Sequence, residues 1–118
     1  MRFKKLLIHR CMVIREGPVK GRDPYGRDIR DQVKDHRVPC RFDQIKTALS
    51  FDQNGVDIIT RNLLYFDHDV KIDINSKIED VKDLNGNMIL EGTYTIMDLL
   101  PIYRKDKLHH YEIEVQKE

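Results

Sequence analysis

The chain has 118 residues, which is the length of one domain, so an enzyme with its active site in a cleft between two domains is not expected. Lysine and arginine number 21 against 20 aspartate and glutamate residues, and a formal net charge of +1 gives no whole-molecule field that attracts nucleic acid or an anionic membrane. Hydrophobic residues make up 40% of the chain, but its apolar runs are far too short to cross a bilayer, which predicts a single soluble domain over residues 1–118.

The N-terminal segment predicts no export. Residues Met1 to Ile8 begin like a signal peptide, but His9 and Arg10 interrupt the apolar stretch and no small-residue cleavage site follows. Without a secretory signal, the two cysteines, Cys11 and Cys40, are expected to be reduced thiols. We therefore expect the protein to be made and assembled in the cytoplasm.

Short runs of alternating apolar and polar residues dominate the sequence and predict an all-β fold, a small barrel or sandwich of six or seven strands. The expected strands, in chain order, are Leu6–Arg15, Val38–Phe42, Val56–Phe66, Val70–Ile74, Ile78–Leu84, Met88–Leu90 continuing after a bend at Gly92 as Thr93–Leu99, and Leu108–Val115. Pro39 lacks a backbone N–H, so it is expected at a sheet edge or a β-bulge. At most one short helix is expected, after Asp43, where Ile45, Ala48 and Leu49 would share a face.

Residues Glu16 to Arg37 differ from the rest of the chain. They hold three of the six glycines, Pro18 and Pro24, and eleven charged side chains, so they cannot bury much surface. We expect an extended, flexible loop at about residues 16–37 that leaves the fold. Two interpretations remain open: a solvated connection, or a loop that reaches a partner or lines a channel. For the second interpretation, the candidate contact residues are Lys20, Arg22, Tyr25, Arg27, Arg30 and Lys34.

Two Asn-Gly pairs predict turns. Asn85-Gly86 is the strongest hairpin signal in the chain, and Asn54-Gly55 precedes the strand expected from Val56. Residues Asp52 to Asp57 also carry carboxylates and amides like those of a calcium loop, but the ligand pattern of such a loop and its terminal glutamate are absent. A plain turn is expected there, and this turn is a second candidate projection.

Four potential zinc ligands lie in or beside the first two expected strands: His9, Cys11, His36 and Cys40. Pairing of those strands would bring two nitrogen and two sulfur donors together. The spacings match no common zinc motif, and small buried cysteines are frequent in β cores. Core packing is therefore expected, and no metal or cofactor is assigned.

Asp73, Asp80 and Lys82 follow the acid, then acid-x-Lys order of many metal-dependent nucleases. In a chain with 35% charged residues such a triplet arises by chance, so solvated charges on strand faces are the expectation. His109-His110 offers adjacent imidazoles, but alternation sends neighbouring side chains to opposite faces, so these two are not expected to act as a pair. With no phosphate-binding loop and no nucleophile elbow, no catalytic residue is assigned and an enzyme is not expected.

The order of features along the chain is distinctive. An N-terminal strand is followed by the long charged segment, the run Arg37–Phe42, the cluster Ile89–Ile96 and a final alternating strand. This order resembles the small head-tail joining proteins, the head-closure or connector proteins of tailed phages and prophages, particularly those of defective prophages of Gram-positive bacteria. In that family a Gly-x-Tyr-x-Ile/Val segment precedes a loop and the last strand, and Gly92, Tyr94 and Ile96 match it as structural residues.

The resemblance implies a small β-barrel that assembles as a ring between the portal and the tail. Such a protein contacts the portal or an adaptor, tail proteins and copies of itself, lies close to packaged DNA, and has no membrane partner. It helps to close the head and retain DNA, first in the bacterial cytoplasm during assembly and then in the virion. No catalysis is implied.

A nucleic-acid-binding barrel of the OB or SH3-like kind is the alternative. In such a protein, aromatic side chains on one sheet face stack against bases, and Tyr65, Phe66 and Tyr94 are the candidates. The strands lack the basic residues that usually alternate with such aromatics, which favours the connector.

Overall fold

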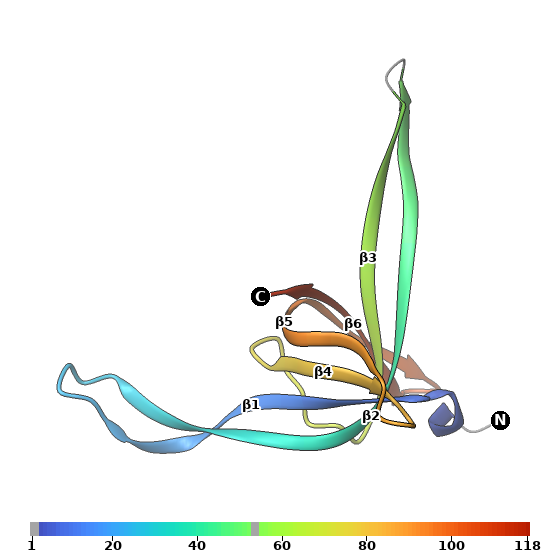
Figure 1. The fold of residues 1–118 in the computed structure, drawn as a ribbon. Coiled ribbons are helices and arrows are strands. Elements are labelled where there is room, and N and C mark those ends of the chain that lie inside the picture. The colour runs from blue at the N-terminus through green and yellow to red at the C-terminus, as the bar shows by residue number, and fades with distance from the viewer. Residues whose placement is uncertain (1–2, 53–54) are drawn as a thin grey trace.

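The computed structural model describes residues 3–52 and 55–118, which are almost entirely β (Figure 1). Within these ranges the elements are the 3-10 helix η1 (Phe3–Leu6) and the strands β1 (His9–Arg22), β2 (Asp28–Asp52), β3 (Gly55–Asp67), β4 (Lys77–Asp83), β5 (Met88–Arg104) and β6 (Lys107–Lys117). The strands pair antiparallel and close into a barrel in the order β1-β2-β3-β6-β5-β4. The predicted all-β fold with six or seven strands is therefore confirmed. No helix in the described ranges is long and apolar enough to cross a membrane.

Alternating side chains fill the barrel. Leu64 and Phe66 on β3 and Ile113 on β6 have no exposed surface, and neither have Ile78 and Val81 on β4. The whole buried cluster consists of Cys11, Val13, Val38, Cys40, Leu64, Phe66, Ile78, Val81, Tyr94, Ile96, Ile113 and Val115. On β2 and β6 the buried positions recur every second residue, as the alternation there predicts. On β1 the alternation predicts an apolar face of Leu6, Ile8, Met12 and Ile14, and this prediction is wrong: the core takes Cys11 and Val13, whereas Leu6 and Ile8 are exposed.

Two hairpins leave the barrel in different directions (Figure 1). β1 pairs with β4 only as far as Ile14, whereas its pairing with β2 continues to the pair Arg22 and Asp28; we call residues 15–34 the charged arm. β3 pairs with β6 only from Asn62 onward, and we call residues 45–61 the apolar arm. The radius of gyration is 17.2 Å. A compact chain of this length would have about 13 to 14 Å, so the arms account for a large part of the extension.

The segment Glu16 to Arg37 is a β-hairpin, so the prediction of an irregular loop there is wrong. Register shifts on either side of Val19 accommodate Pro18 and the neighbouring glycines within the ladder. At the turn, one carboxylate oxygen of Asp23 accepts hydrogen bonds from the backbone N–H groups of Tyr25 and Arg27, both at 2.9 Å. The glycines and prolines of this segment therefore lie in bulges and in the turn of a regular hairpin.

Two further expected elements are absent from the described ranges. The helix after Asp43 is not formed, because β2 continues through this segment and pairs with β3, and this ladder overrides a short local helical pattern. Val70–Ile74 is not a strand but part of the connection between β3 and β4. Val70 and Ile72 still pack against the core, so their alternation reflects burial without sheet pairing.

The sequence signals for a bulge near Pro39 and for a turn at Asn85-Gly86 agree better with the structure than the two absent elements do. Arg37 has φ 54, and the register shift between Cys11 and Val13 places it in a bulge two residues before Pro39. Gly86 has φ 88 in the β4–β5 turn, as its Asn-Gly pair predicts. The other predicted turn cannot be judged, because Asn54 lies outside the described residues.

Truncation of the central aromatic residue tests this core. Phe66→Ala should lower the free energy of unfolding by about 3–5 kcal/mol, because Phe66 is fully buried and the substitution leaves a cavity. Tyr103→Ala, at a side chain that is 61% exposed, should change it by less than about 0.5 kcal/mol. Urea titration followed by circular dichroism gives both values, and equal effects would contradict this assignment of the core.

Candidate functional site

The charged arm neutralises its own cations. Four of the predicted contact residues form ion pairs within the arm: Lys20 with Asp31 at 3.0 Å, Arg22 with Asp28 at 3.5 Å, Arg27 with Asp23 at 3.2 Å and Arg30 with Glu16 at 3.9 Å. Three of these pairs join β1 to β2. Exposed pairs of this kind contribute about 0–1 kcal/mol each, so their main effect is to cancel charge along the arm.

The tip of the charged arm carries an aromatic side chain. Tyr25 is 83% exposed, and the guanidinium carbon of Arg27 lies 5.5 Å from its ring centroid. Lys34, the last predicted contact residue, is exposed at the base of the arm. The six residues therefore lie on one projecting hairpin, but they do not present a row of free cations.

The segment Gly92, Tyr94 and Ile96 is structural in this fold. Gly92 has φ 93 at a bulge in β5, and its N–H donates to the Asp80 carboxylate at 2.9 Å. Asp80 itself has φ 52, on the opposite strand. Tyr94 and Ile96 point into the core. The bulge bends β5 without ending it, which is why the two strands expected on either side of Gly92 form one strand.

The four potential zinc ligands do not converge. Cys11 and Cys40 are buried together, and the hydrogen bond between their thiols, followed by burial, raises the pKa of Cys11 well above its ordinary value. Nδ1 of His9 accepts a hydrogen bond from the backbone N–H of Phe42 at 2.9 Å, and His36 is exposed. Among the described residues, no group of three or more His, Cys, Asp or Glu side chains is arranged to hold a metal ion. The cysteines act as core residues here.

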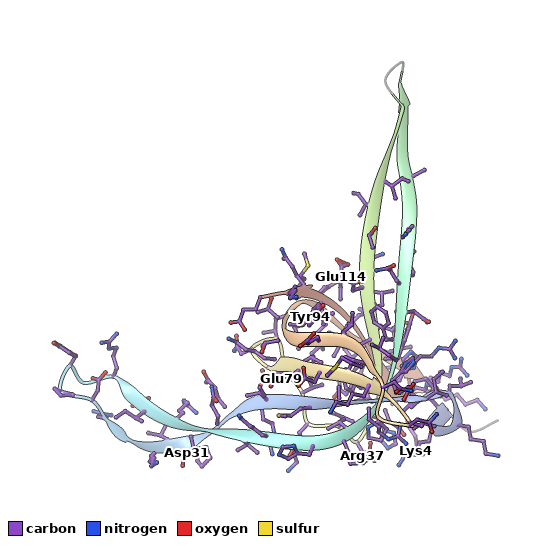
Figure 2. All side chains as sticks on the ribbon, in the orientation of Figure 1. Lys4, Asp31, Arg37, Glu79, Tyr94 and Glu114 are labelled. Carbon is purple, nitrogen blue, oxygen red and sulfur yellow. The ribbon has the colours of Figure 1, made fainter. Side chains whose placement is uncertain are left out.

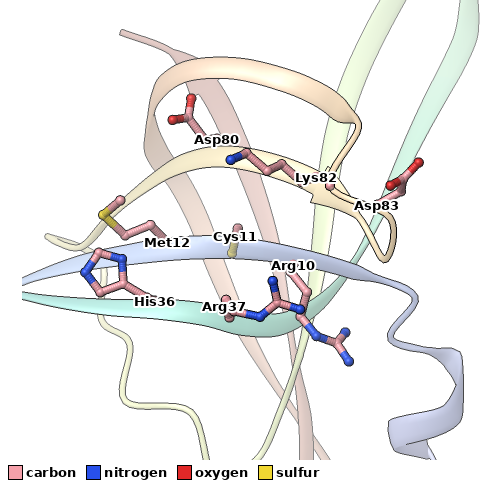
Figure 3. Close-up of a pocket in the computed structure, with 9 residues that line it drawn as sticks. Arg10, Cys11, Met12, His36, Arg37, Asp80, Lys82 and Asp83 are labelled. Carbon is pink, nitrogen blue, oxygen red and sulfur yellow. The ribbon is translucent and has the colours of Figure 1, made fainter.

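Asp80 and Lys82 line a small cavity of about 150 Å³ that extends over β1, from β4 on one side to the bulge of β2 on the other (Figure 3). Asp73 is not part of this cavity; it accepts from the backbone N–H of Asn75 at 2.8 Å, in the connection before β4. The second acid at the cavity, Asp83, accepts hydrogen bonds from Asn87 that lower its pKa. The carboxylates near Lys82 are thus bound to backbone and amide N–H groups of the β4–β5 hairpin, which is a structural arrangement.

His109 and His110 meet, contrary to the expectation that they face opposite sides. The register shift between Ile102 and Tyr103 leaves His109 as an extra residue in β6, and this bulge breaks the alternation. Their Nδ1 atoms lie 2.7 Å apart. At this distance one Nδ1 atom donates a hydrogen bond and the other accepts it. Burial, followed by the charge of Arg104, lowers the pKa of His109.

η1 closes this end of the barrel over the histidine pair. The ring of Phe3 stacks on His110 with centroids 4.7 Å apart and meets His109 edge-on at 5.1 Å. Beside them, Asp67 is only 6% exposed and accepts from the ring nitrogen of His68 at 2.8 Å. No local sequence pattern indicates this cluster, because only the bulge and the docking of η1 bring its members together.

The three aromatic residues of the alternative function do not form an exposed platform. Phe66 has no exposed surface and Tyr94 is 7% exposed, both inside the barrel. Tyr65 points outward and is partly covered; burial and the nearby Glu112 raise its pKa. Base stacking on these side chains would require the barrel to open.

Comparison with protein-family models, with curated proteins and with solved structures gives no match for this chain. Two features of the structure therefore provide the evidence on function. The first is the pair of projecting arms. The second is the end of the barrel around η1.

A substitution at Asp80 tests its structural role. Asp80→Ala should lower the free energy of unfolding by about 1–3 kcal/mol, because the Gly92 N–H loses its acceptor. Asp80→Asn keeps an acceptor oxygen and tolerates the left-handed backbone, so it should lose clearly less. Glu91→Ala, at an exposed neighbouring position, is the control and should have little effect. Equal losses in both Asp80 variants would contradict this role.

The environment of His9 predicts a pH dependence of stability. Burial, followed by the charge of Arg41, lowers the pKa of His9, so the unfolded chain takes up this proton first as the pH falls. The stability that His9 contributes is present above its unfolded pKa of about 6.5 and is lost below it. Between about pH 7.5 and 5.5, His9→Gln should reduce the fall in melting temperature, whereas His36→Gln at an exposed position should not. A similar fall in wild type and His9→Gln would contradict the assignment.

Proposed function

We propose that this protein is a ring subunit of a phage or prophage head-tail connector. In this role it lies between portal and tail, helps to close the head and retains the packaged DNA. Two lines of argument support the proposal: the sequence resemblance to head-tail joining proteins, and the two arms that leave the barrel. The arms are the main observation in its support, because in the described ranges the strands of each arm pair only with each other.

A two-stranded hairpin is marginally stable in water unless further strands or a packed surface support it. Both arms extend beyond the barrel sheet, where in the described ranges each of their strands pairs only with its hairpin partner. Each arm therefore presents unpaired N–H and C=O groups along its outer edges. Neighbouring subunits that supply the missing contacts would stabilise the arms and explain their length.

The apolar arm has the composition of a docking element. The side chains of Ile58, Ile59 and Ile45 are 62%, 45% and 40% exposed. Few of the exposed residues that the structure describes in this arm are charged. Full burial of one such side chain contributes about 1.5–3 kcal/mol. Contacts of these three isoleucines with a neighbour would therefore supply much of the free energy of a specific interface.

The barrel offers an apolar surface on which the apolar arm of a neighbour could dock. Beyond Ile96, β5 pairs only with β6 in the described ranges, so its other edge is open, and it carries the exposed side chains of Met97, Leu100 and Tyr103. An arm of one subunit on the β5 edge of the next is a head-to-tail contact between different surfaces. Contacts of this type close into a ring when the rotation between subunits allows it.

The charged arm fits a protein partner better than DNA. Its cations are already paired with carboxylates of the same arm, so binding to phosphate would require these pairs to break. The exposed Tyr25 at the tip is the kind of side chain that anchors protein interfaces. Of the two interpretations of residues 16–37, contact with the portal or a neighbouring subunit is therefore the one that we adopt.

Deletion of the gene in the bacterium that carries it tests the proposal. The expected result is heads that lack tails and have lost their DNA, counted by negative-stain electron microscopy after induction. Complementation with wild type should restore joined particles. Ile58→Asp should not restore them, because it places a charge in the proposed interface, whereas Ile74→Asp, at an isoleucine 50% exposed on the barrel, should restore them. Normally joined particles after deletion would refute the connector function.

A further inference from the structure

The end of the barrel beside η1 contains an open cavity of about 930 Å³. η1, the turn after β3 and the β5–β6 turn surround it, and Lys4 marks this end of the molecule (Figure 2). We call it the basic end cavity. Its ionisable lining residues are Lys4, Asp67, His68, Arg104, Lys107 and His109. Three permanent cations thus face one carboxylate.

The one carboxylate of the basic end cavity is already engaged. Asp67 accepts hydrogen bonds from the ring and the backbone N–H of His68 at 2.8 and 2.7 Å. It also lies 3.8 Å from the ammonium group of Lys4, which has a second partner in Asp69 at 3.2 Å. Arg104 and Lys107 have no ion-pair partner among the described residues.

Arg104 and Lys107 lie directly opposite each other across the β5–β6 turn. Like charges at such a position destabilise a hairpin. Both residues between them have a left-handed backbone, with φ 50 at Lys105 and 64 at Asp106. Aspartate tolerates this conformation, whereas it adds strain at lysine. The charged arm, in contrast, pairs nearly every cation with a carboxylate. A chain with a net charge of +1 thus concentrates uncompensated positive charge at one turn.

An anion bound between these two side chains would remove the repulsion. A guanidinium such as that of Arg104 binds two oxygens of a phosphate at once, and the ammonium groups of Lys107 and Lys4 add point charges. His109 stays neutral beside Arg104, because burial and that charge lower its pKa, so it adds no further repulsion. The cavity is wide and open, whereas sites for small ligands enclose most of the ligand. These properties fit successive phosphates of a polymer.

We propose that the basic end cavity binds phosphate groups of the duplex DNA backbone without reading sequence, with Arg104 and Lys107 as the principal contacts. All of its lining residues belong to one chain, so binding requires neither the ring nor a portal. The choice of duplex DNA rests on the proposed function, in which the connector retains packaged DNA. The binding test uses the isolated chain and the deletion test uses particles, so failure of one is distinguishable from failure of the other.

Fluorescence anisotropy of a labelled duplex of arbitrary sequence tests the proposal on the isolated full chain. Arg104→Ala/Lys107→Ala should weaken binding at least tenfold and reduce the slope of log affinity against log salt by about two, one unit for each lost phosphate contact. Lys20→Ala/Arg22→Ala removes the same charge from the charged arm and should change affinity less than twofold. Arg104→Lys keeps the charge and should retain most of the binding.

Thermal melting separates lost binding from lost folding. Removal of the Arg104 and Lys107 charges relieves a repulsion, so the melting temperature of that double variant should be equal to or above that of wild type. An equal loss of affinity in the Lys20/Arg22 control would show a whole-molecule charge effect and overturn the proposal. Absence of duplex binding would also overturn the proposal. The same holds if NMR shifts at Arg104 show that inorganic phosphate binds while DNA does not.

Discussion

Strand β2 changes its neighbour at Cys40, and the rest of the structure depends on that change. Cys40 is the one described position of β2 that is in register with both β1, at His9, and β3, at Phe66. Before it β2 pairs with β1 alone, and after it with β3 alone. A single strand of 25 residues thus belongs to the barrel at its centre and to a different arm at each end. Core packing at this position, where Cys40 has no exposed surface, holds the two hairpins in their separate directions.

The two arms differ in chemistry, and this difference agrees with different partners. The charged arm carries compensated charges and an exposed tyrosine at its tip, which suits a polar protein surface. The apolar arm exposes isoleucines and suits a hydrophobic contact with a neighbour. In a ring, one arm can link adjacent subunits while the other reaches the component above or below. The barrel between them then serves as a rigid body that fixes the angle between the contacts.

Charge in this protein is balanced locally rather than globally. The formal net charge of +1 conceals a charged arm that cancels itself and a barrel end where Arg104 and Lys107 oppose each other without acidic partners in the described ranges. Composition could therefore exclude a strongly charged molecule but not a strongly charged site. The run from Arg104 to Lys107, with three cations in four residues, was the signal for this site in the sequence.

The amino-acid sequence by itself determined the fold class, the strands β3, β4 and β6 and the inward-facing residues of β2 and β6, because side-chain alternation and turn chemistry are local properties. Tertiary structure alone decided the partners of each strand. Pairing with β3 turned the expected helix after Asp43 into strand, and a bulge brought His109 and His110 together. The backbone ladder between β1 and β2, with its bulges, made a hairpin of residues 16–37. These outcomes depend on contacts between residues far apart in the chain, and no local pattern encodes which distant strand a segment will meet.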